Sequence, residues 1–283
     1  MTTESISTTA IPPGESFLRM RNVDVALGDS VVLHDIRLDI EAGENIAILG
    51  PNGCGKSTLI RTLNCEIYPL VQPGMEMRIF GRARWDVTEL RRYFGVVSDN
   101  IPGHQGYSRA ADTAGCTTAR TTGLDAVIAG FFSASTLWPN LHVTGIMRER
   151  ASEALERIEA THLATRKVGE MSAGEKRRIL IARALVHRPR QLLLDEPSNA
   201  LDMAAQRDLR NTLRSLAAEG TGLIMVTHLL GDILPEMRRV LLMRSGRILA
   251  DGPREALLTE PTLSDLFQTE VRIGRDGEWL HSW

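Results

Sequence analysis

Hydrophobic and polar residues alternate along the first part of the chain, which is the pattern of strands that bury one face. The alternation runs through residues 17–26 and again through residues 31–40. Apolar runs without alternation are typical of strands buried on both faces, and they occur at residues 45–49, 94–97, 192–195 and 222–227. A hairpin is expected over residues 240–243 and 247–250, around Ser245-Gly246.

Helical periodicity separates several of these strands. Helices are expected from near Lys56, across most of residues 124–169, and over residues 175–187 and 203–218. Within residues 148–160, Ala151, Leu155 and Ile158 fall on one face beneath a charged face. Strands that alternate with helices imply a parallel sheet covered on both sides. The fold class is therefore α/β, with a helical subdomain inserted into the core.

Polar segments divide the chain. Residues 1–16 predict a flexible polar tail. Residues 17–283 are expected to form a single domain, in which residues of about 100–185 make up the helical subdomain. Residues 99–123 are rich in Gly, Ala, Ser and Thr and indicate a loop or an insertion. No internal repeat is visible.

Composition excludes several classes of protein. Hydrophobic residues make up 43% of the 283 residues and charged residues 24%, which is typical of a globular protein. The net charge is −2 and aromatic residues are only 5%, which argues against a general nucleic-acid surface, so no direct nucleic-acid partner is expected. The three cysteines, Cys54, Cys65 and Cys116, form no zinc pattern and favour a reducing, cytoplasmic setting.

No membrane or export segment is expected. The N-terminus has neither a basic region nor an apolar region of a secretory signal. Residues 126–147 carry no Asp, Glu, Lys or Arg, but polar residues and Pro139 interrupt them. A membrane span needs roughly 20 predominantly apolar residues. The sequence therefore predicts no membrane anchor of its own.

The most informative motif follows the apolar run at residues 45–49. It matches the phosphate-loop pattern G-x-x-x-x-G-K-[ST] between a strand and a helix, and its residues are Gly50, Pro51, Asn52, Gly53, Cys54, Gly55, Lys56 and Ser57, followed by Thr58. Backbone N–H groups of such a loop surround phosphate oxygens, and the helix N-terminus adds partial positive charge. Lys56 is expected to reach the β- and γ-phosphates, and Ser57 to coordinate Mg²⁺. The spacing does not match the dinucleotide pattern G-x-G-x-x-G.

A second motif consists of two carboxylates at the end of an apolar run, Asp195 and Glu196. Side chains alternate along a strand, so the two are expected to point in different directions. Asp195 is then placed to hold Mg²⁺, and Glu196 to act as general base or to orient the attacking water. The alternative is a solvated acidic turn before a helix.

With these motifs in place, Met171-Ser172-Ala173-Gly174-Glu175 resembles the signature Leu-Ser-Gly-Gly-Gln of ABC (ATP-binding cassette) transporter ATPases. The resemblance covers roughly residues 17–252. It implies a P-loop NTPase core with a mixed or parallel sheet, an antiparallel β subdomain and an inserted helical subdomain. It also implies that Ser172, Ala173, Gly174 and Glu175 cap the γ-phosphate of ATP bound to a second copy, so that ATP lies between two chains. Taken alone, these residues are an ordinary helix cap.

Two further features follow in the order of the family. Residues 198–202, which end at Asp202, resemble the D-loop that crosses the dimer interface. His228 follows an apolar run and resembles the switch histidine, which contacts the γ-phosphate and holds the attacking water. The resemblance thus assigns catalysis to Lys56, Glu196 and His228.

Several positions depart from the family pattern. Leu27 stands where an aromatic residue usually stacks on adenine, and Asp99 stands where the Q-loop glutamine is expected. Leu27 provides apolar contact without stacking. Asp99 offers a carboxylate that reaches Mg²⁺ or water but is shorter than glutamine. Ala173 adds a methyl group to the signature, and Glu175 adds a negative charge.

The function that the resemblance implies is ATP hydrolysis, with Mg²⁺, by a homodimeric cytoplasmic subunit bound to a separate membrane permease. The first alternative is a non-transport ABC ATPase that acts on nucleic acid, ribosomes or another soluble complex. An unrelated phosphate-loop kinase or GTPase, and an ATPase that binds without turnover, are further alternatives. The cargo and the direction of transport stay open, with import favoured because no membrane part is fused.

Overall fold

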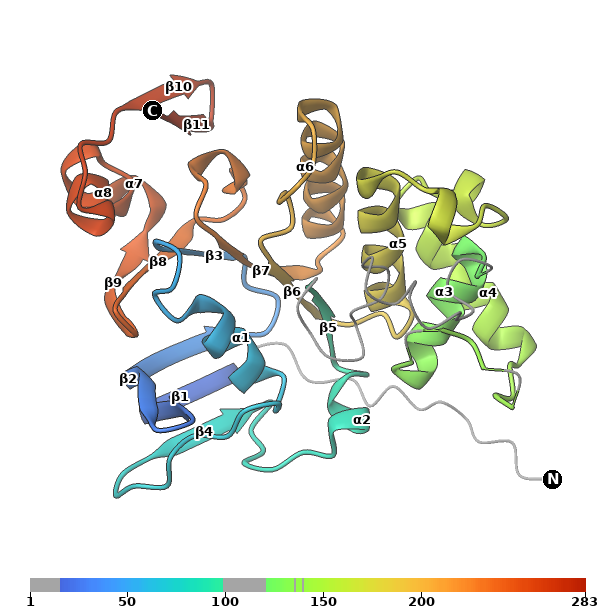
Figure 1. Ribbon diagram of the computed structural model, residues 1–283, viewed down its shortest axis with the longest axis horizontal. Coiled ribbons are helices and arrows are strands. Elements are labelled where there is room, and N and C mark those ends of the chain that lie inside the picture. The colour runs from blue at the N-terminus through green and yellow to red at the C-terminus, as the bar shows by residue number, and fades with distance from the viewer. Residues whose placement is uncertain (1–15, 99–120, 135, 139) are drawn as a thin grey trace.

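A six-stranded mixed sheet forms the centre of the computed structural model, which describes residues 16–98, 121–134, 136–138 and 140–283 (Figure 1). Its order is β5-β6-β7-β3-β8-β9, parallel from β5 to β8, with β9 antiparallel at the edge. Every residue of β3, β5, β6 and β7 is buried, as the apolar runs predict. The strands are β3 Ile46–Leu49, β5 Phe94–Val97, β6 Gln191–Asp195, β7 Gly222–Thr227, β8 Arg239–Arg244 and β9 Arg247–Pro253.

A smaller antiparallel sheet has the order β2-β1-β4. The strands are β1 Ser16–Leu27, β2 Ser30–Glu41 and β4 Glu76–Ile79. Alternate residues of β2 from Leu33 onward are largely buried and exposed in turn, as expected for a sheet with one solvated face. The fold class predicted from the sequence is therefore confirmed. β4 was not predicted, because its four residues are not an apolar run like those of β3 and β5 and are too few to establish an alternation.

Helices cover the central sheet and form a separate group beside it (Figure 1). The expected helical stretch over residues 124–169 is broken in the structure. Ser133 adopts a left-handed conformation (φ 52°) and ends the first part of it. The predicted core positions Ala151, Leu155 and Ile158 are all buried. From the phosphate loop to the middle of the central sheet, the helices are α1 Lys56–Leu63, α2 Val87–Leu90, α3 Gly123–Ile128, η3 Ala129–Phe132, α4 Gly145–Arg157, η4 Thr161–Leu163, η5 Val168–Glu170, α5 Ala173–Leu185 and α6 Met203–Ala218.

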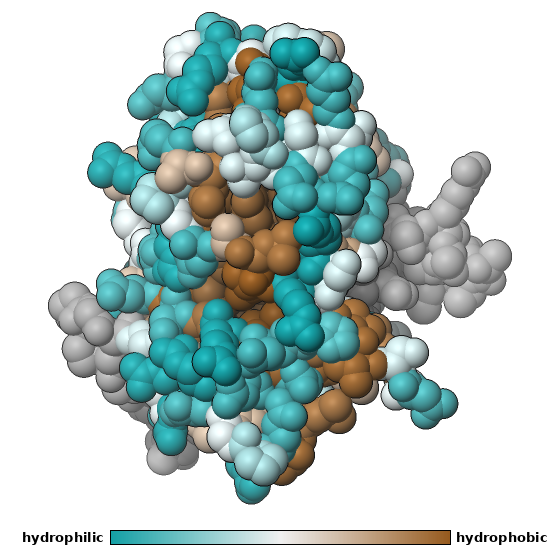
Figure 2. All heavy atoms as spheres, turned by 90° about the vertical axis from the view of Figure 1, so that its left-hand side faces the viewer, coloured by the Kyte–Doolittle hydropathy of each residue, from teal (hydrophilic) through white to brown (hydrophobic). Residues whose placement is uncertain are grey.

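The end of the chain contains elements that the pattern did not predict. After β9 come α7 Arg254–Leu257, α8 Glu260–Phe267 and a hairpin of β10 Ile273–Asp276 and β11 Trp279–Ser282. On the face of the molecule that carries β9 and the C-terminal helices, hydrophobic side chains gather along the middle (Figure 2). Exposed hydrophobic residues of β2 and β9 include Val31 and Leu249. None of the helices in the described part of the chain has the length and apolar character needed to cross a bilayer.

The central sheet separates two hydrophobic clusters. β3 contributes Ala47 and Leu49 to the cluster shared with the helical side, and Ile46 and Ile48 to the cluster shared with the smaller sheet. Successive side chains of a strand point to opposite faces, so both clusters meet at this one buried strand. Packing on both faces of β3 therefore fixes the position of the residues that follow this strand.

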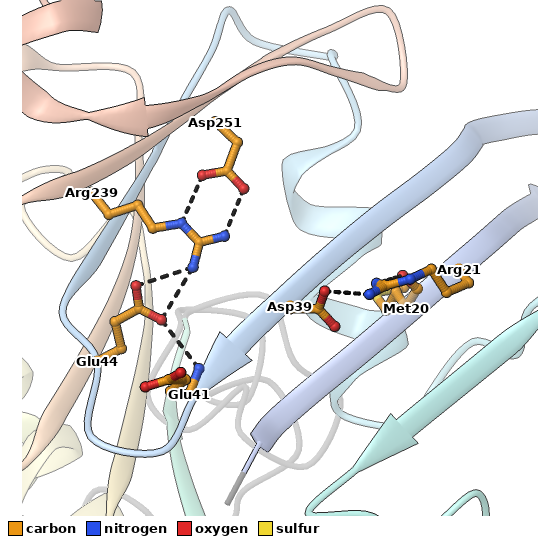
Figure 3. Close-up of polar contacts among 7 residues, drawn as sticks. All are labelled: Met20, Arg21, Asp39, Glu41, Glu44, Arg239 and Asp251. Carbon is orange, nitrogen blue, oxygen red and sulfur yellow. Dashed lines mark hydrogen bonds and ion pairs between the residues drawn. The ribbon is translucent and has the colours of Figure 1, made fainter. Parts of the chain in front are cut away.

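An ion network joins the β8–β9 hairpin to the turn that precedes β3 (Figure 3). The Arg239 guanidinium donates to both carboxylate oxygens of Asp251, at 2.7 and 2.6 Å, and to Glu44 at 3.0 and 3.2 Å. These hydrogen bonds raise the pKa of Arg239, because they stabilise its charged form. On the smaller sheet, Figure 3 also shows the pair Arg21–Asp39, which is more exposed to solvent.

We expect Arg239→Met to lower the free energy of unfolding by about 1–2 kcal/mol, because it leaves two partly buried carboxylates without their shared cation. Chemical denaturation monitored by circular dichroism measures the change. Arg21→Met is the matched control, since an exposed pair contributes little. Equal losses in the two variants would contradict a special role for the Arg239 network.

His187 lies just after α5, where its ring contacts the Phe131 ring edge-on at 5.1 Å between centroids. Burial, together with the nearby charges of Arg92 and Arg150, lowers the pKa of His187 to about 4. The folded protein therefore keeps this imidazole neutral down to that pH, whereas the unfolded chain takes up a proton near pH 6.5.

Stability is expected to fall as the pH drops from about 6.5 to about 4, by at most about 3 kcal/mol from this group. Denaturant midpoints at several pH values measure the fall. His187→Asn does not titrate, so the difference between wild type and variant should grow smaller toward low pH. A difference independent of pH would show that His187 titrates normally.

Candidate functional site

The phosphate loop leaves the buried strand β3 and enters α1 at Lys56. Gly53 and Gly55 have left-handed backbones (φ 76° and 104°), which residues with a Cβ rarely adopt. A Cβ on Gly50 would lie 2.3 Å from the carbonyl oxygen of Met243 on β8. The glycines of the motif are thus required by backbone shape and by close packing.

Hydrogen bonds connect the phosphate loop to the turn between β8 and β9. The Gly246 N–H donates to the Cys54 carbonyl at 2.9 Å, and the His34 N–H donates to the Gly246 carbonyl at 2.9 Å. Cys54 is buried, and this burial raises the pKa of its thiol. Cys54 therefore packs beneath the loop and does not face outward.

The Lys56 side chain is 4% exposed. Its Nζ donates to the carbonyl oxygens of Gly50 at 2.8 Å and Pro51 at 3.0 Å. Glu196 Oε1 lies 3.8 Å from the same nitrogen. A buried ammonium needs such partners, and phosphate oxygens that enter the loop would meet a cation already aimed across it.

Glu196 follows β6 in a left-handed conformation (φ 45°). Its Oε1 lies 3.3 Å from His228 Nδ1, and its N–H donates to the Val226 carbonyl at 2.8 Å. The strand ends at Asp195, so strand alternation does not apply to this pair. Asp195 and Glu196 differ in backbone conformation because Glu196 begins a turn.

Asp195 and Ser57 carry the oxygen atoms suited to a hard cation. Asp195 is 7% exposed and accepts a hydrogen bond from Ser98 Oγ at 3.1 Å, whereas Ser57 is exposed. The third predicted metal ligand, Asp99, lies outside the described residues. Within the described segments, no group of three His, Cys, Asp or Glu could hold a metal alone. This donor set fits Mg²⁺, which keeps waters and uses substrate phosphates as ligands.

A cleft of about 490 Å³ brings most of these groups together. Leu27 is 39% exposed and lies at this cleft with the phosphate loop, as an adenine contact would require. Of the predicted nucleotide-binding residues, Gly50, Pro51 and Cys54 do not line it. The lining residues are Leu27, Val32, Asn52, Gly53, Gly55, Lys56, Ser57, Thr58, Asp195, Glu196 and Asn199.

Two lining residues, Val32 and Asn199, were not among the predicted site residues. Val32 reaches the cleft because β1 and β2 pair across a tight turn, with Leu27 opposite Ser30. The Gly28-Asp29 turn was the available signal for this placement. Asn199 lies in the predicted D-loop segment, three residues after Glu196. This short separation was a signal that Asn199 lies close to the Glu196 carboxylate.

The predicted signature residues lie apart from this cleft, at the start of α5. Ser172 Oγ accepts the Glu175 N–H at 3.2 Å, and Glu175 Oε2 accepts the Ser172 N–H at 2.8 Å. The hydrogen bond from the Ser172 backbone is the main cause that lowers the pKa of Glu175. The Arg166 guanidinium, 2.5 Å from Glu175 Oε1, lowers it further. A Cβ on Gly174 would lie 2.9 Å from the Ala205 Cβ, so α5 and α6 approach closely here.

Asp202, the predicted D-loop residue, caps α6 by accepting the Ala205 N–H at 2.8 Å. It does not line the cleft. Ser172 and Asp202 therefore each cap a helix of their own chain. A contact with a second chain would be an additional role. The cleft offers binding of a phosphate chain beside the carboxylates of Asp195 and Glu196. His228 does not line it, but its imidazole reaches the site through Glu196.

Comparison with known proteins gives consistent results. A family model described as ABC transporter matches residues 33–199. The hemin import ATP-binding protein HmuV of Aliivibrio fischeri is 32% identical over 246 residues, which are 84% of this chain and 86% of that protein. The structure of cbiO1 from Clostridium perfringens, part of the ABC transporter complex cbiONQ, is similar with a TM-score of 0.70 and 26% identity, over 89% of this chain and 94% of that one. The dimeric structure of MJ0796, a bacterial ABC transporter cassette, is similar with a TM-score of 0.64 and 25% identity, over 83% of this chain and 98% of that one.

The position of Leu27 can be tested directly. Leu27→Tyr is expected to tighten ATP binding by about tenfold, because an aromatic ring adds stacking on the base. Titration with a fluorescent ATP analogue measures the dissociation constant. Val31→Tyr is the matched control, since Val31 is equally exposed but does not line the cleft. Unchanged affinity in Leu27→Tyr would place the base elsewhere.

Proposed function

This chain belongs to the ABC transporter family and is a transport ATPase, and from that premise we propose that two copies enclose ATP and drive a separate membrane permease. One observation carries the hydrolytic part of the proposal. Glu196 Oε1 lies 3.3 Å from His228 Nδ1 and 3.8 Å from Lys56 Nζ, at the mouth of the phosphate loop.

Each group in the cleft has a proposed task in binding. Lys56 and the loop N–H groups hold the β- and γ-phosphates, and Leu27 contacts the base. Ser57 and Asp195 would hold Mg²⁺, which supplies positive charge to the phosphates when it is bound. The carbonyls of Gly50 and Pro51 keep Lys56 extended across the loop, so little rearrangement is needed for ATP to enter.

Hydrolysis is proposed to use Glu196 and His228. Water attacks the γ-phosphorus, Glu196 orients the water and accepts its proton, and the bond to the ADP oxygen breaks. His228 holds the γ-phosphate and the water through its imidazole. The 3.3 Å between Glu196 Oε1 and His228 Nδ1 supports this division of tasks, because it keeps the two side chains together.

The dimer is proposed because the cleft is incomplete. It contains groups for the base, the phosphates and the water, but Ser172, Ala173, Gly174 and Glu175 are absent from its lining. In the dimer, the start of α5 of one copy caps the γ-phosphate of the other with N–H groups and a helix N-terminus. Asp202 lies at the same interface. The dimeric cassette among the similar structures supports this arrangement.

We also propose that residues 17–283 form one ATPase domain, with residues of about 100–185 as its helical subdomain. The permease partner places the protein at the cytoplasmic face of the membrane. The hemin import relative supports import as the direction of transport.

The two-copy arrangement predicts the behaviour of Glu196→Gln. This variant removes the proton acceptor and keeps the side-chain shape, so ATP should stay intact and hold a stable dimer. Gel filtration with light scattering, in the presence of Mg²⁺ and ATP, measures the mass. Only monomers under these conditions would refute the proposed mechanism.

The dimer of Glu196→Gln should disappear when Ser172→Arg is added, while binding of ATP to the monomer persists. The added charge and bulk lie at the start of α5, outside the cleft of the same chain. Ser152→Arg, on an exposed helical position outside both regions, is the control. A dimer that survives Ser172→Arg would mean that the signature does not meet the partner's nucleotide.

A further inference from the structure

Asp232 is a buried carboxylate that the proposed mechanism does not use. It lies in η6 Leu230–Asp232, four residues after His228, and is 4% exposed. Its Oδ2 accepts hydrogen bonds from Ser198 Oγ at 2.6 Å and from Thr227 Oγ1 at 2.7 Å. Both hydroxyl-bearing residues are themselves buried. One oxygen atom thus joins two segments that are far apart in the sequence.

The direction of these hydrogen bonds is determined by chemistry. An ionised carboxylate only accepts, so both hydroxyl groups donate to it. Thr227 Oγ1 also accepts the Leu229 N–H at 3.0 Å. The chain of bonds runs from Leu229 through Thr227 to Asp232, and Ser198 meets it there. Bonds to a charged acceptor are stronger than neutral ones, and those in a connected set reinforce one another.

The two joined segments are those that carry the reacting side chains. Ser198 comes two residues after Glu196, and Thr227 directly precedes His228. Glu196 lies beyond the end of β6 with a left-handed backbone, and its N–H donates to the Val226 carbonyl of β7 at 2.8 Å. The bonds of Asp232 add a second tie between these segments, on the far side of Glu196 along the chain. A link between Ser198 and Thr227 limits how far the Glu196 carboxylate and the His228 imidazole can separate.

Asp232 is held in turn by α6 and the C-terminal hairpin. Arg210 of α6 donates to the carbonyl oxygen of Gly231 at 2.7 Å. The Arg210 guanidinium also lies over the Trp279 ring of β11, 5.4 Å from its centroid. The carboxylate therefore projects from a short helix that is supported on its outer side.

We propose that Asp232 is a positioning residue for ATP hydrolysis, which sets the distance between Glu196 and His228 by joining Ser198 to Thr227. This inference rests on the proposed function, because it assumes that Glu196 and His228 act together. Asp232 itself does not line the cleft and touches no reacting atom.

The test compares Asp232→Ala with Asp232→Asn. Alanine removes the acceptor and leaves two buried hydroxyl groups without it. Asparagine retains one side-chain oxygen, and both hydroxyl groups already share a single oxygen. We expect kcat to fall about ten- to a hundredfold in Asp232→Ala, as for other small misplacements of reacting groups. Asp232→Asn should stay within about threefold of wild type.

Binding separates positioning from simple loss of structure. The dissociation constant for ATP should change less than about twofold in both variants, because the Lys56 contacts are untouched. Ser198→Ala and Thr227→Val each remove one of the two bonds, and each should lower kcat less than Asp232→Ala. Neither should worsen Asp232→Ala when combined with it, because the link is already broken.

Asp251→Ala is the control for stability alone, since it disrupts the Arg239 network away from the cleft. It should lower the melting temperature and leave kcat unchanged.

If wild type hydrolyses ATP and Asp232→Ala keeps full kcat, the inference is overturned and the proposed function stands. Equal damage in Asp232→Asn and Asp232→Ala would also overturn it. If wild type binds ATP without hydrolysing it, the proposed function fails, and this inference fails with it.

Discussion

Parallel pairing of β6, β7 and β3 is the constraint on which the site depends. Leu49 pairs with Thr227, and Asp195 pairs with Val226, so the carboxyl ends of three strands lie at one level. Each strand continues into a segment of the candidate site, namely the phosphate loop, the turn of Glu196 and the loop of His228. A shift of one residue in either register would move one of these groups by about 3.3 Å and reverse its side chain.

The electrostatics of the cleft depend on a single buried cation. Lys56 is almost inaccessible to solvent, and two loop carbonyls and one carboxylate offset the cost of its burial. The same contacts point its charge toward the space that phosphates would occupy. Because the partners of Lys56 belong to the loop and to the turn after β6, the cation also links two of the three strand ends.

Residues far from the loop in sequence determine its shape. The Gly246 turn donates to Cys54, and a Cβ on Gly246 would lie 2.0 Å from the Val32 carbonyl oxygen. The smaller sheet, the β8–β9 hairpin and the phosphate loop therefore meet at one point. The buried carboxylate of Asp232 likewise joins distant segments, namely the turn after β6 and the end of β7.

Local patterns in the sequence determined much of this protein. The strands of the central sheet, the helices after the phosphate loop and after Asp202, and the glycine-rich loop itself were all visible, because each depends on neighbours within a few residues. Lys56, Ser57, Asp195 and Glu196 were visible for the same reason, and the roles assigned to them remain proposals.

Only the tertiary structure decided how these segments meet. It placed His228 beside Glu196, brought Val32 into the cleft, and made Asp232 a bridge between Ser198 and Thr227. It also turned Glu196 out of the strand and packed an unforeseen C-terminal hairpin against α6. Such contacts depend on strand order and register, which join residues 30 or more positions apart, and periodicity of hydrophobic residues carries no information over that range.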